Sequence, residues 1–147
     1  MAHIKRTAVA SFSVRQLFDL VNAVERYPDF LPWCSQSHIV SRTEQTIEAT
    51  LEIAWGGMRK SFTTRNELHP HDRIDIVLVN GPFRELKGHW RFIPIDETSC
   101  HVILDLEFDV GGRLIDKIFQ PIFHGIADSL VDIFCKRAEA IYQPIHT

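Results

Sequence analysis

Residues 111–142 carry the pattern that most limits how this chain can fold. Apolar side chains recur there at spacings of three and four, which predicts one long helix with one buried face. The stripe comprises Ile115, Ile118, Phe119, Ile122, Phe123, Ile126, Leu130, Ile133, Phe134, Ala138 and Ile141. At about 1.5 Å per residue this helix exceeds the needs of a compact domain, so we expect its end to project or to bend at Pro121 or Gly125.

The segment between Ser35 and Asp109 has the two-residue period of strands instead. With a first strand near the N-terminus, we expect strands at Ile4–Ala10, Gln36–Arg42, Thr46–Trp55, Met58–Leu68, Arg73–Asn80, Phe83–Pro94 and Ser99–Val110. Two short helices, Val14–Val24 and one within Glu25–Cys34, follow the first strand. Short connections between the strands force an antiparallel meander. We expect the polar Gln36–Arg42 strand near an edge of the sheet. We expect Gly88 at a β-bulge or where another backbone segment approaches closely.

A long apolar helix after a run of strands must bury its stripe against them. The fold class is therefore α+β: a curved antiparallel sheet of about seven strands wrapped around the C-terminal helix, in one domain spanning residues 1–147. Such an arrangement leaves room for an apolar cavity between the sheet and the helix.

Composition excludes several classes of function. The net charge of −3 gives no global attraction to nucleic acid, although eleven arginines and five lysines allow a local basic patch. Three separated cysteines argue for a reducing compartment and against a disulfide framework or zinc site. The N-terminus has no signal-peptide pattern, and no apolar run approaches ~20 residues. We therefore expect a cytoplasmic protein without a transmembrane helix.

The apolar side chains of the sheet favour two readings, a fully packed core or a ligand cavity. On the sheet they are Trp55, Phe62, Trp90, Phe92 and Phe108, and on the helix Phe119, Ile122, Phe123 and Ile126. Thr64 and Asn66 share the face of Phe62, where buried polar groups need partners. In a cavity they would orient the polar group of a ligand. A structure without a cavity beside Thr64 and Asn66 would exclude the second reading.

The segment from Tyr27 to Cys34 packs three aromatic residues around two prolines. Pro28 can open a short helix and Pro32 can close it. Tyr27, Phe30 and Trp33 would then cap the open end of the sheet, and the same segment would serve as a rigid lid.

No catalytic motif stands out. The chain lacks a phosphate-binding loop and any recognisable nucleophile–base arrangement. His69 and His71 lie in a proline-containing turn without a further ligand at metal spacing, so we assign no metal site. We expect no catalytic residue and no required cofactor.

Four blocks of this sequence resemble those of a known protein family. The run Val21–Cys34 (VNAVERYPDFLPWC) is similar to the signature block of the START-like coenzyme Q-binding and ribosome association toxin family, which includes polyketide cyclase-like proteins. Residues 60–66, 78–83 and 88–94 resemble its later blocks in order. Toxin-named relatives often have glycine where this chain has Trp33, so no ribosome contact is carried over to Trp33. The resemblance implies a helix-grip fold.

The resemblance also implies two roles. In the first, the cavity binds a lipophilic ligand such as ubiquinone or a similar isoprenoid lipid and supports respiratory electron transport, with a peripheral position and transient contact at the inner membrane. In the second, the protein binds the large ribosomal subunit, blocks its joining to the small subunit and is paired with an antitoxin. Cyclase-type catalysis is a third reading, but we find no acid–base pair for it.

For ligand binding we select ten residues. They are Tyr27, Phe30, Leu31, Phe62, Thr64, Asn66, Trp90, Phe92, Phe119 and Phe123. For the ribosome the candidates are the surface arginines, whose contacts to phosphate would make binding salt-sensitive. They are Arg59, Arg65, Arg84 and Arg91.

Overall fold

The fold is a seven-stranded antiparallel sheet with three α-helices. The computed structural model describes residues 2–142, apart from the side chains of 114–116. The strands are β1 (Ala2–Ala10), β2 (Cys34–Arg42), β3 (Thr46–Trp55), β4 (Met58–His69), β5 (Arg73–Asn80), β6 (Glu85–Asp96) and β7 (Ser99–Asp109). The helices are α1 (Val14–Asn22), the 3-10 turn η1 (Val24–Arg26), α2 (Tyr27–Phe30) and α3 (Leu114–Ile141). This order confirms the predicted succession of elements.

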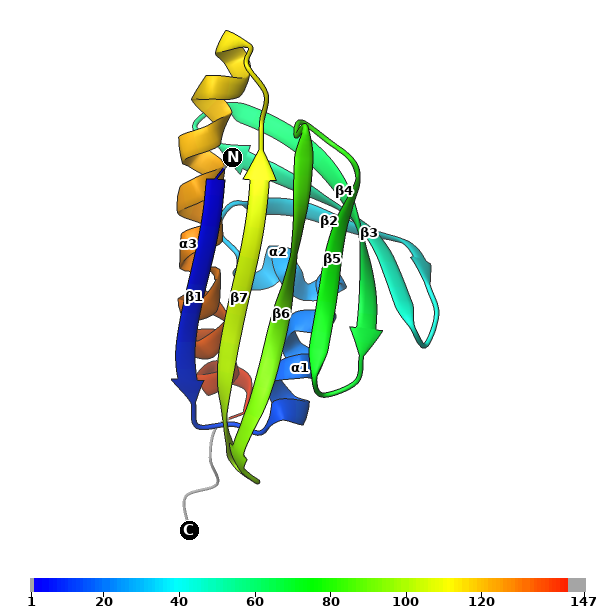
Figure 1. The fold of residues 1–147 in the computed structure, drawn as a ribbon, viewed down its shortest axis with the longest axis vertical. Helices are drawn as coiled ribbons and strands as arrows, with labels where there is room; N and C mark the ends of the chain where they lie inside the picture. Colours follow the sequence, from blue (N-terminus) through cyan, green and yellow to red (C-terminus); the bar gives the residue numbers. More distant parts are fainter. Residues whose placement is uncertain (1, 143–147) are drawn as a thin grey trace.

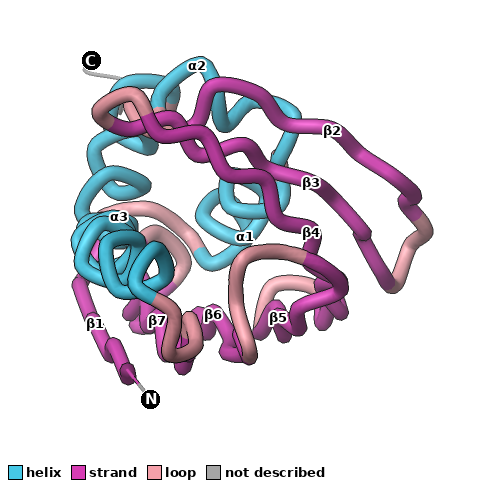
Figure 2. The backbone as a smooth tube through the Cα atoms, turned by 90° about the horizontal axis from the view of Figure 1, so that it is seen from above, coloured by secondary structure: helices cyan, strands magenta, loops and turns pink. Residues whose placement is uncertain are grey.

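The sheet is open, with a meander from β2 to β7 and with β1 added at the β7 edge. Its strand order is β1-β7-β6-β5-β4-β3-β2, so the first strand pairs with the last. The polar β2 lies at the other edge, as predicted. Figure 1 shows the strands in this order, and Figure 2 shows from above that the sheet curves around the three helices. All three helices therefore lie on the concave side.

The N-terminal cap of α1 follows directly from its sequence. The Ser13 hydroxyl accepts a hydrogen bond from the Gln16 amide at 3.2 Å, and the Gln16 side chain accepts one from the Ser13 amide at 3.0 Å. This reciprocal capping box satisfies two amide groups that a helix start leaves unpaired. The helix then buries Leu17, Phe18 and Val21 towards the interior.

The long helix α3 packs on one side of the concave surface. It contacts β1, β7 and α1, and it continues through Pro121. Figure 1 shows its first turns projecting beyond the end of β7, in line with the expectation that an end projects. The predicted stripe is partly wrong, because Ile118 is 54% exposed and Ile141 is 45% exposed. The side chain of Ile115 lies outside the described residues.

By length and composition alone, Lys117–Ile141 could cross a membrane, which the sequence did not lead us to expect. Its mean hydropathy is 1.2. The most apolar face of the same segment, including Phe119, Phe123 and Phe134, is buried in the fold. Packing in the fold thus accounts for part of the high hydropathy, since 33% of the most apolar window is buried.

Gly88 is required by a close approach in the centre of the sheet. It lies opposite Leu106 of β7 and Ile76 of β5. A Cβ atom at this position would lie 2.2 Å from the carbonyl oxygen of Asp105 and 2.8 Å from the Cα of Leu106. Because both of these are backbone atoms, they can move only if the ladder shifts.

Replacing Gly88 with alanine should therefore destabilise the fold by about 1–3 kcal/mol, the usual cost of overpacking. Urea unfolding followed by circular dichroism measures the change. The matched control is Gly112→Ala, since a Cβ there has no neighbour within 4 Å. Equal midpoints for Gly88→Ala and the wild-type protein would contradict this account of β6.

Candidate functional site

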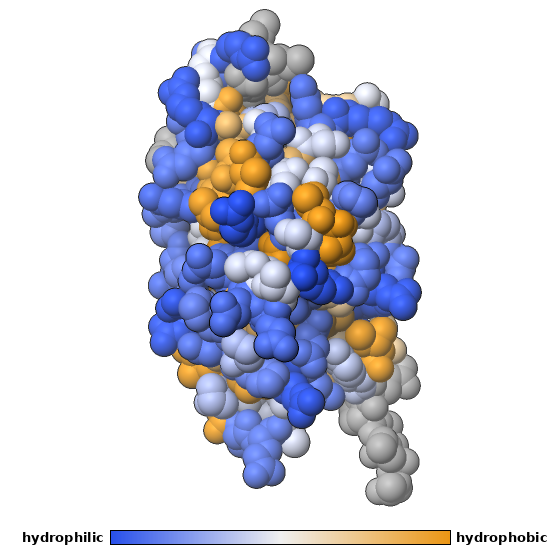
Figure 3. All heavy atoms as spheres, turned by 90° about the vertical axis from the view of Figure 1, so that its right-hand side faces the viewer, coloured by the Kyte–Doolittle hydropathy of each residue, from blue (hydrophilic) through white to orange (hydrophobic). Residues whose placement is uncertain are grey.

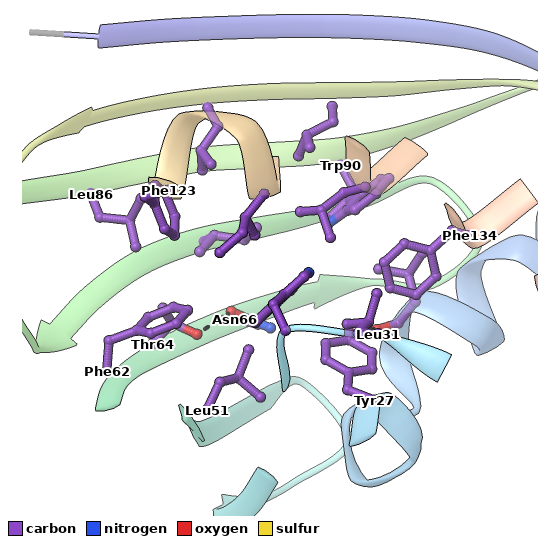
Figure 4. Close-up of a pocket in the computed structure, with 17 residues that line it drawn as sticks. Tyr27, Leu31, Leu51, Phe62, Thr64, Asn66, Leu86, Trp90, Phe123 and Phe134 are labelled. Atoms are coloured by element: carbon purple, nitrogen blue, oxygen red, sulfur yellow. Dashed lines mark hydrogen bonds between the residues drawn. The ribbon is translucent and has the colours of Figure 1, made fainter. Parts of the chain in front are cut away.

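A partly enclosed cavity lies between the concave face of the sheet and the helices. Residues from β3 to β7, α1, α3 and the segment around α2 line it (Figure 4). They are Val21, Tyr27, Leu31, Trp33, Leu51, Phe62, Thr64, Asn66, Ile76, Leu86, Trp90, Leu104, Leu106, Phe123, Ile126, Leu130 and Phe134. Because the cavity lies beside Thr64 and Asn66, the structure does not exclude a ligand cavity at these residues.

The cavity exists because α3 covers only part of the sheet. Among the strands its backbone lies closest to β1 and β7, and it reaches β4 and β6 through the ring contacts of Phe123 with Phe62 and of Phe134 with Trp90. The cavity volume is about 90 Å³. Small-molecule sites typically measure about 300–1,000 Å³. A ligand larger than a small ring must therefore displace lining side chains or extend beyond this space.

Two polar side chains mark one wall of the cavity. Thr64, only 8% exposed, donates a hydrogen bond from its hydroxyl to the Asn66 side-chain oxygen at 3.2 Å. Figure 4 shows the two side chains next to each other on β4, surrounded by apolar groups. This bond orients the Asn66 amide and leaves its NH2 group as the donor of the pair.

The Tyr27–Cys34 segment closes one end of the cavity. The buried Tyr27 hydroxyl donates a hydrogen bond to the carbonyl oxygen of Val21. The Tyr27 ring packs edge-on against Phe134 of α3, with ring centroids 5.4 Å apart. Leu31 is fully buried behind it. The segment is thus fixed to both α1 and α3, as expected of a rigid cap.

Seven of the ten selected residues line the cavity. They are Tyr27, Leu31, Phe62, Thr64, Asn66, Trp90 and Phe123. The other three lie outside the lining. Phe92 packs edge-on against Phe18, Phe119 packs against Phe83, and Phe30 lies under the guanidinium of Arg137. Periodicity placed Phe92 and Phe119 on buried faces, and each of the three is in ring contact with a residue that does line the cavity: Phe92 with Trp90, Phe119 with Phe123 and Phe30 with Phe134.

Several lining residues were not among those selected. Phe134 and Ile126 belong to the predicted helical stripe, and Leu86, Leu104 and Leu106 to the predicted inner faces of the strands. Periodicity identifies their faces but not their depth along the helix or strand. Trp33 was considered only as part of the cap. Ile122, expected on the cavity wall, lines an external groove instead.

Trp55 also differs from its predicted place. The alternation along β3 puts it in the interior, but it is 50% exposed. It is the last residue of β3, next to the turn at Gly56 and Gly57. The strand ends there, so Trp55 lies beside α3 on the outside of the molecule together with Pro121 and Ile122.

The cavity offers no acid–base pair. Among its described lining residues, the side chains able to form hydrogen bonds are Tyr27, Trp33, Thr64 and Asn66. Burial raises the pKa of Tyr27, so its phenol stays neutral. Burial likewise raises the pKa of the nearby Cys34 thiol to about 11, which disfavours the nucleophilic thiolate. This chemistry suits binding rather than proton transfer.

The arginines selected for ribosome binding are exposed, and three of them are ion-paired. Arg59 lies 3.0 Å from Glu52, Arg65 lies 3.0 Å from Glu48, and Arg84 lies 3.7 Å from Asp109. The outer face therefore alternates in charge and does not form one basic patch. Such exposed pairs contribute little stability, typically less than about 1 kcal/mol each.

One surface group has the composition of a metal site. Atoms of Glu67, His69 and Asp75 that could act as ligands lie within 4.8 Å of one another. The Asp75 carboxylate, however, is 2.9 Å from Nε of Arg73 and 3.1 Å from Nε2 of His69. The group is already an ion-pair network. His71, the other histidine considered in the sequence, packs against Phe18 instead.

Comparison with known proteins agrees with this architecture. The family model described as polyketide cyclase / dehydrase and lipid transport matches residues 10–135. The Zhui aromatase/cyclase from Streptomyces sp. R1128 superposes with a TM-score of 0.85 over 97% of this chain and 96% of its own. The two share 15% identity, so the likeness shows the START-like fold alone.

Two relatives point beyond the fold. The ribosome association toxin RatA of Pseudomonas aeruginosa is 46% identical over 95% of this chain and 97% of its own length. The mitochondrial coenzyme Q-binding protein COQ10 homolog B of Xenopus laevis is 26% identical over 91% of this chain and 57% of its own length. The chain thus belongs to the polyketide cyclase / dehydrase and lipid transport family, with proteins named as ribosome association toxins among its close homologues.

Proposed function

We propose that the protein binds a lipophilic ligand with a small polar ring, such as ubiquinone, and supports respiratory electron transport. The observation that carries the proposal is the apolar cavity with the Thr64–Asn66 pair on its wall. The oriented Asn66 amide can donate to a ring carbonyl, while the apolar wall excludes water from that hydrogen bond. A relative named as a coenzyme Q-binding protein supports the choice of a quinone.

The size of the cavity sets how much affinity it can supply. A buried aromatic ring removes about 150 Å² from water, worth roughly 4 kcal/mol at 25 cal/mol per Å² before the costs of ordering. Even without those costs the Kd would be no lower than about 1 mM. Tight binding of an isoprenoid quinone therefore needs further contacts for its hydrocarbon chain.

Organic extraction of the purified protein followed by mass spectrometry should release a quinone or a related isoprenoid lipid. Protein isolated from quinone-rich membranes or loaded with ubiquinone should retain the ligand through gel filtration. Repeated recovery of ligand-free protein after loading would rule out this role.

Thr64→Val should weaken quinone binding about five- to tenfold. The substitution removes the hydrogen bond that orients Asn66, and a net bond of this kind contributes about 1 kcal/mol. The matched control is Thr63→Val on the same strand, because Thr63 bonds to Thr50 at 2.7 Å and is not among the lining residues. Tryptophan fluorescence titration gives both affinities. Equal losses in the two variants would show that Thr64 has no specific part in binding.

We propose ribosome association as a second candidate function, since a toxin-named relative is 46% identical over nearly the whole chain. In this role the protein would bind the large subunit and prevent its joining to the small one. The outer face of the β3–β5 region lies towards the viewer in Figure 3 and is mainly hydrophilic, with a few separate apolar patches. The cavity and this face are different surfaces, so the two functions are compatible.

Charge pairs on that face make the ribosome role testable. Arg65→Ala should weaken association with ribosomes, because it removes a contact to phosphate, whereas Glu48→Ala should strengthen it by releasing Arg65. Sucrose-gradient profiles after overexpression measure the ratio of free subunits to joined ribosomes. Association should also fall as the salt concentration rises. An unchanged ratio on overexpression of the wild-type protein would refute ribosome association.

A further inference from the structure

A second apolar space lies on the outside of α3, directly next to the cavity. We call it the outer groove. It is lined chiefly by Trp33, Trp55, Pro121, Ile122, Gly125 and Ile126, and its volume is about 430 Å³. Trp33 and Ile126 line the cavity as well. These two side chains are therefore a shared wall between the interior and the surface.

Trp33 has an unusual place in this wall. Its side chain is only 4% exposed, yet its indole Nε1 has no hydrogen-bond partner within the described part of the chain. Leaving a buried donor unpaired costs about 1–3 kcal/mol. Buried Trp N–H groups usually find a partner. The protein alone gives no reason for the unpaired donor, whereas a ligand with an acceptor atom at the shared wall would satisfy it.

Gly125 is a second feature that packing does not explain. It lies inside α3, where glycine costs about 0.5–1 kcal/mol relative to alanine. A Cβ atom there would have no neighbour within 4 Å, so no close contact requires glycine. Because Gly125 lines the outer groove, a side chain at this position would occupy part of the groove. The exposed Ile118, one turn before Ile122 on the same helix, extends the apolar surface of α3 near the groove.

We propose that the outer groove binds the hydrocarbon chain of the ligand whose ring occupies the cavity, and that the chain passes between Trp33 and Ile126. In this arrangement the Trp33 indole N–H donates a hydrogen bond to an oxygen on the ring. The proposal rests on the proposed lipophilic-ligand function. The small cavity accepts the ring, and the larger apolar groove directly outside accepts the chain.

Gly125→Leu tests the groove without disturbing the cavity. A leucine side chain would fill the groove, and leucine has the higher helix propensity. The probes are ubiquinone-0, which has no chain, and decylubiquinone. The wild-type protein should bind decylubiquinone at least tenfold more tightly than ubiquinone-0. Gly125→Leu should remove most of that difference and leave the affinity for ubiquinone-0 unchanged. The control is Lys136→Leu at an exposed position of the same helix, which should alter neither affinity.

Trp33→Phe tests the donor. It should weaken binding of ubiquinone-0 about fivefold, and it should weaken binding of decylbenzene, which has no acceptor atom, clearly less. An equal loss for both compounds would assign Trp33 a packing role only and overturn its part as donor.

The remaining outcomes separate the two proposals. Tight binding of both quinones with equal affinity, unaffected by Gly125→Leu, would overturn the outer groove and leave the cavity as the site. Failure of both quinones to bind the wild-type protein would overturn the groove together with the lipophilic-ligand function. If Gly125→Leu instead changes the oligomeric mass in sedimentation velocity, the groove belongs to a second copy of the chain, and the proposal is wrong.

Discussion

The packing of α3 against one side of the curved sheet is the constraint on which the rest of the structure depends. The helix lies against β1 and β7 and buries Phe119, Phe123 and Phe134. Because the sheet has seven strands and one long helix covers only part of it, the inner faces of β4–β6 need other cover. Helix α1 contacts β6, and the segment around α2, which contacts β2, closes one end of the space and is held by Tyr27 against Phe134 and Val21. The cavity is the space that these elements leave unfilled.

The polar groups follow the same geometry. Inside, Thr64 and Asn66 bond to each other on an otherwise apolar wall, and the Trp33 indole N–H finds no partner among residues 2–142 as described. Outside, arginines alternate with carboxylates along neighbouring strands. Binding a lipophilic molecule and docking to a ribosome would therefore use chemically different surfaces. The described cavity lining contains no carboxylate or histidine, and the fold is shared with an aromatase/cyclase.

Much of the fold could be predicted from the sequence because period-two and period-3.6 patterns determine which face of each element is buried. The strand from Arg73 to Asn80 has its predicted bounds, and Gly88 lies at the expected close approach. Depth was harder to predict. Phe92 and Phe119 lie on buried faces but do not line the cavity. Whether a buried side chain reaches the cavity depends on the size and position of the neighbouring aromatic rings, which the sequence pattern does not give. The stripe on α3 covers two adjacent surfaces, the core and the outer groove, which periodicity alone does not distinguish.

The central claim is that the cavity beside Thr64 and Asn66 receives the ring of a lipophilic ligand. A crystal structure of the protein grown with decylubiquinone tests it most directly. The account predicts density for the ring inside the cavity, with a carbonyl oxygen within hydrogen-bond distance of the Asn66 amide. Density for the ring on the outer surface, with the cavity unchanged, would contradict it.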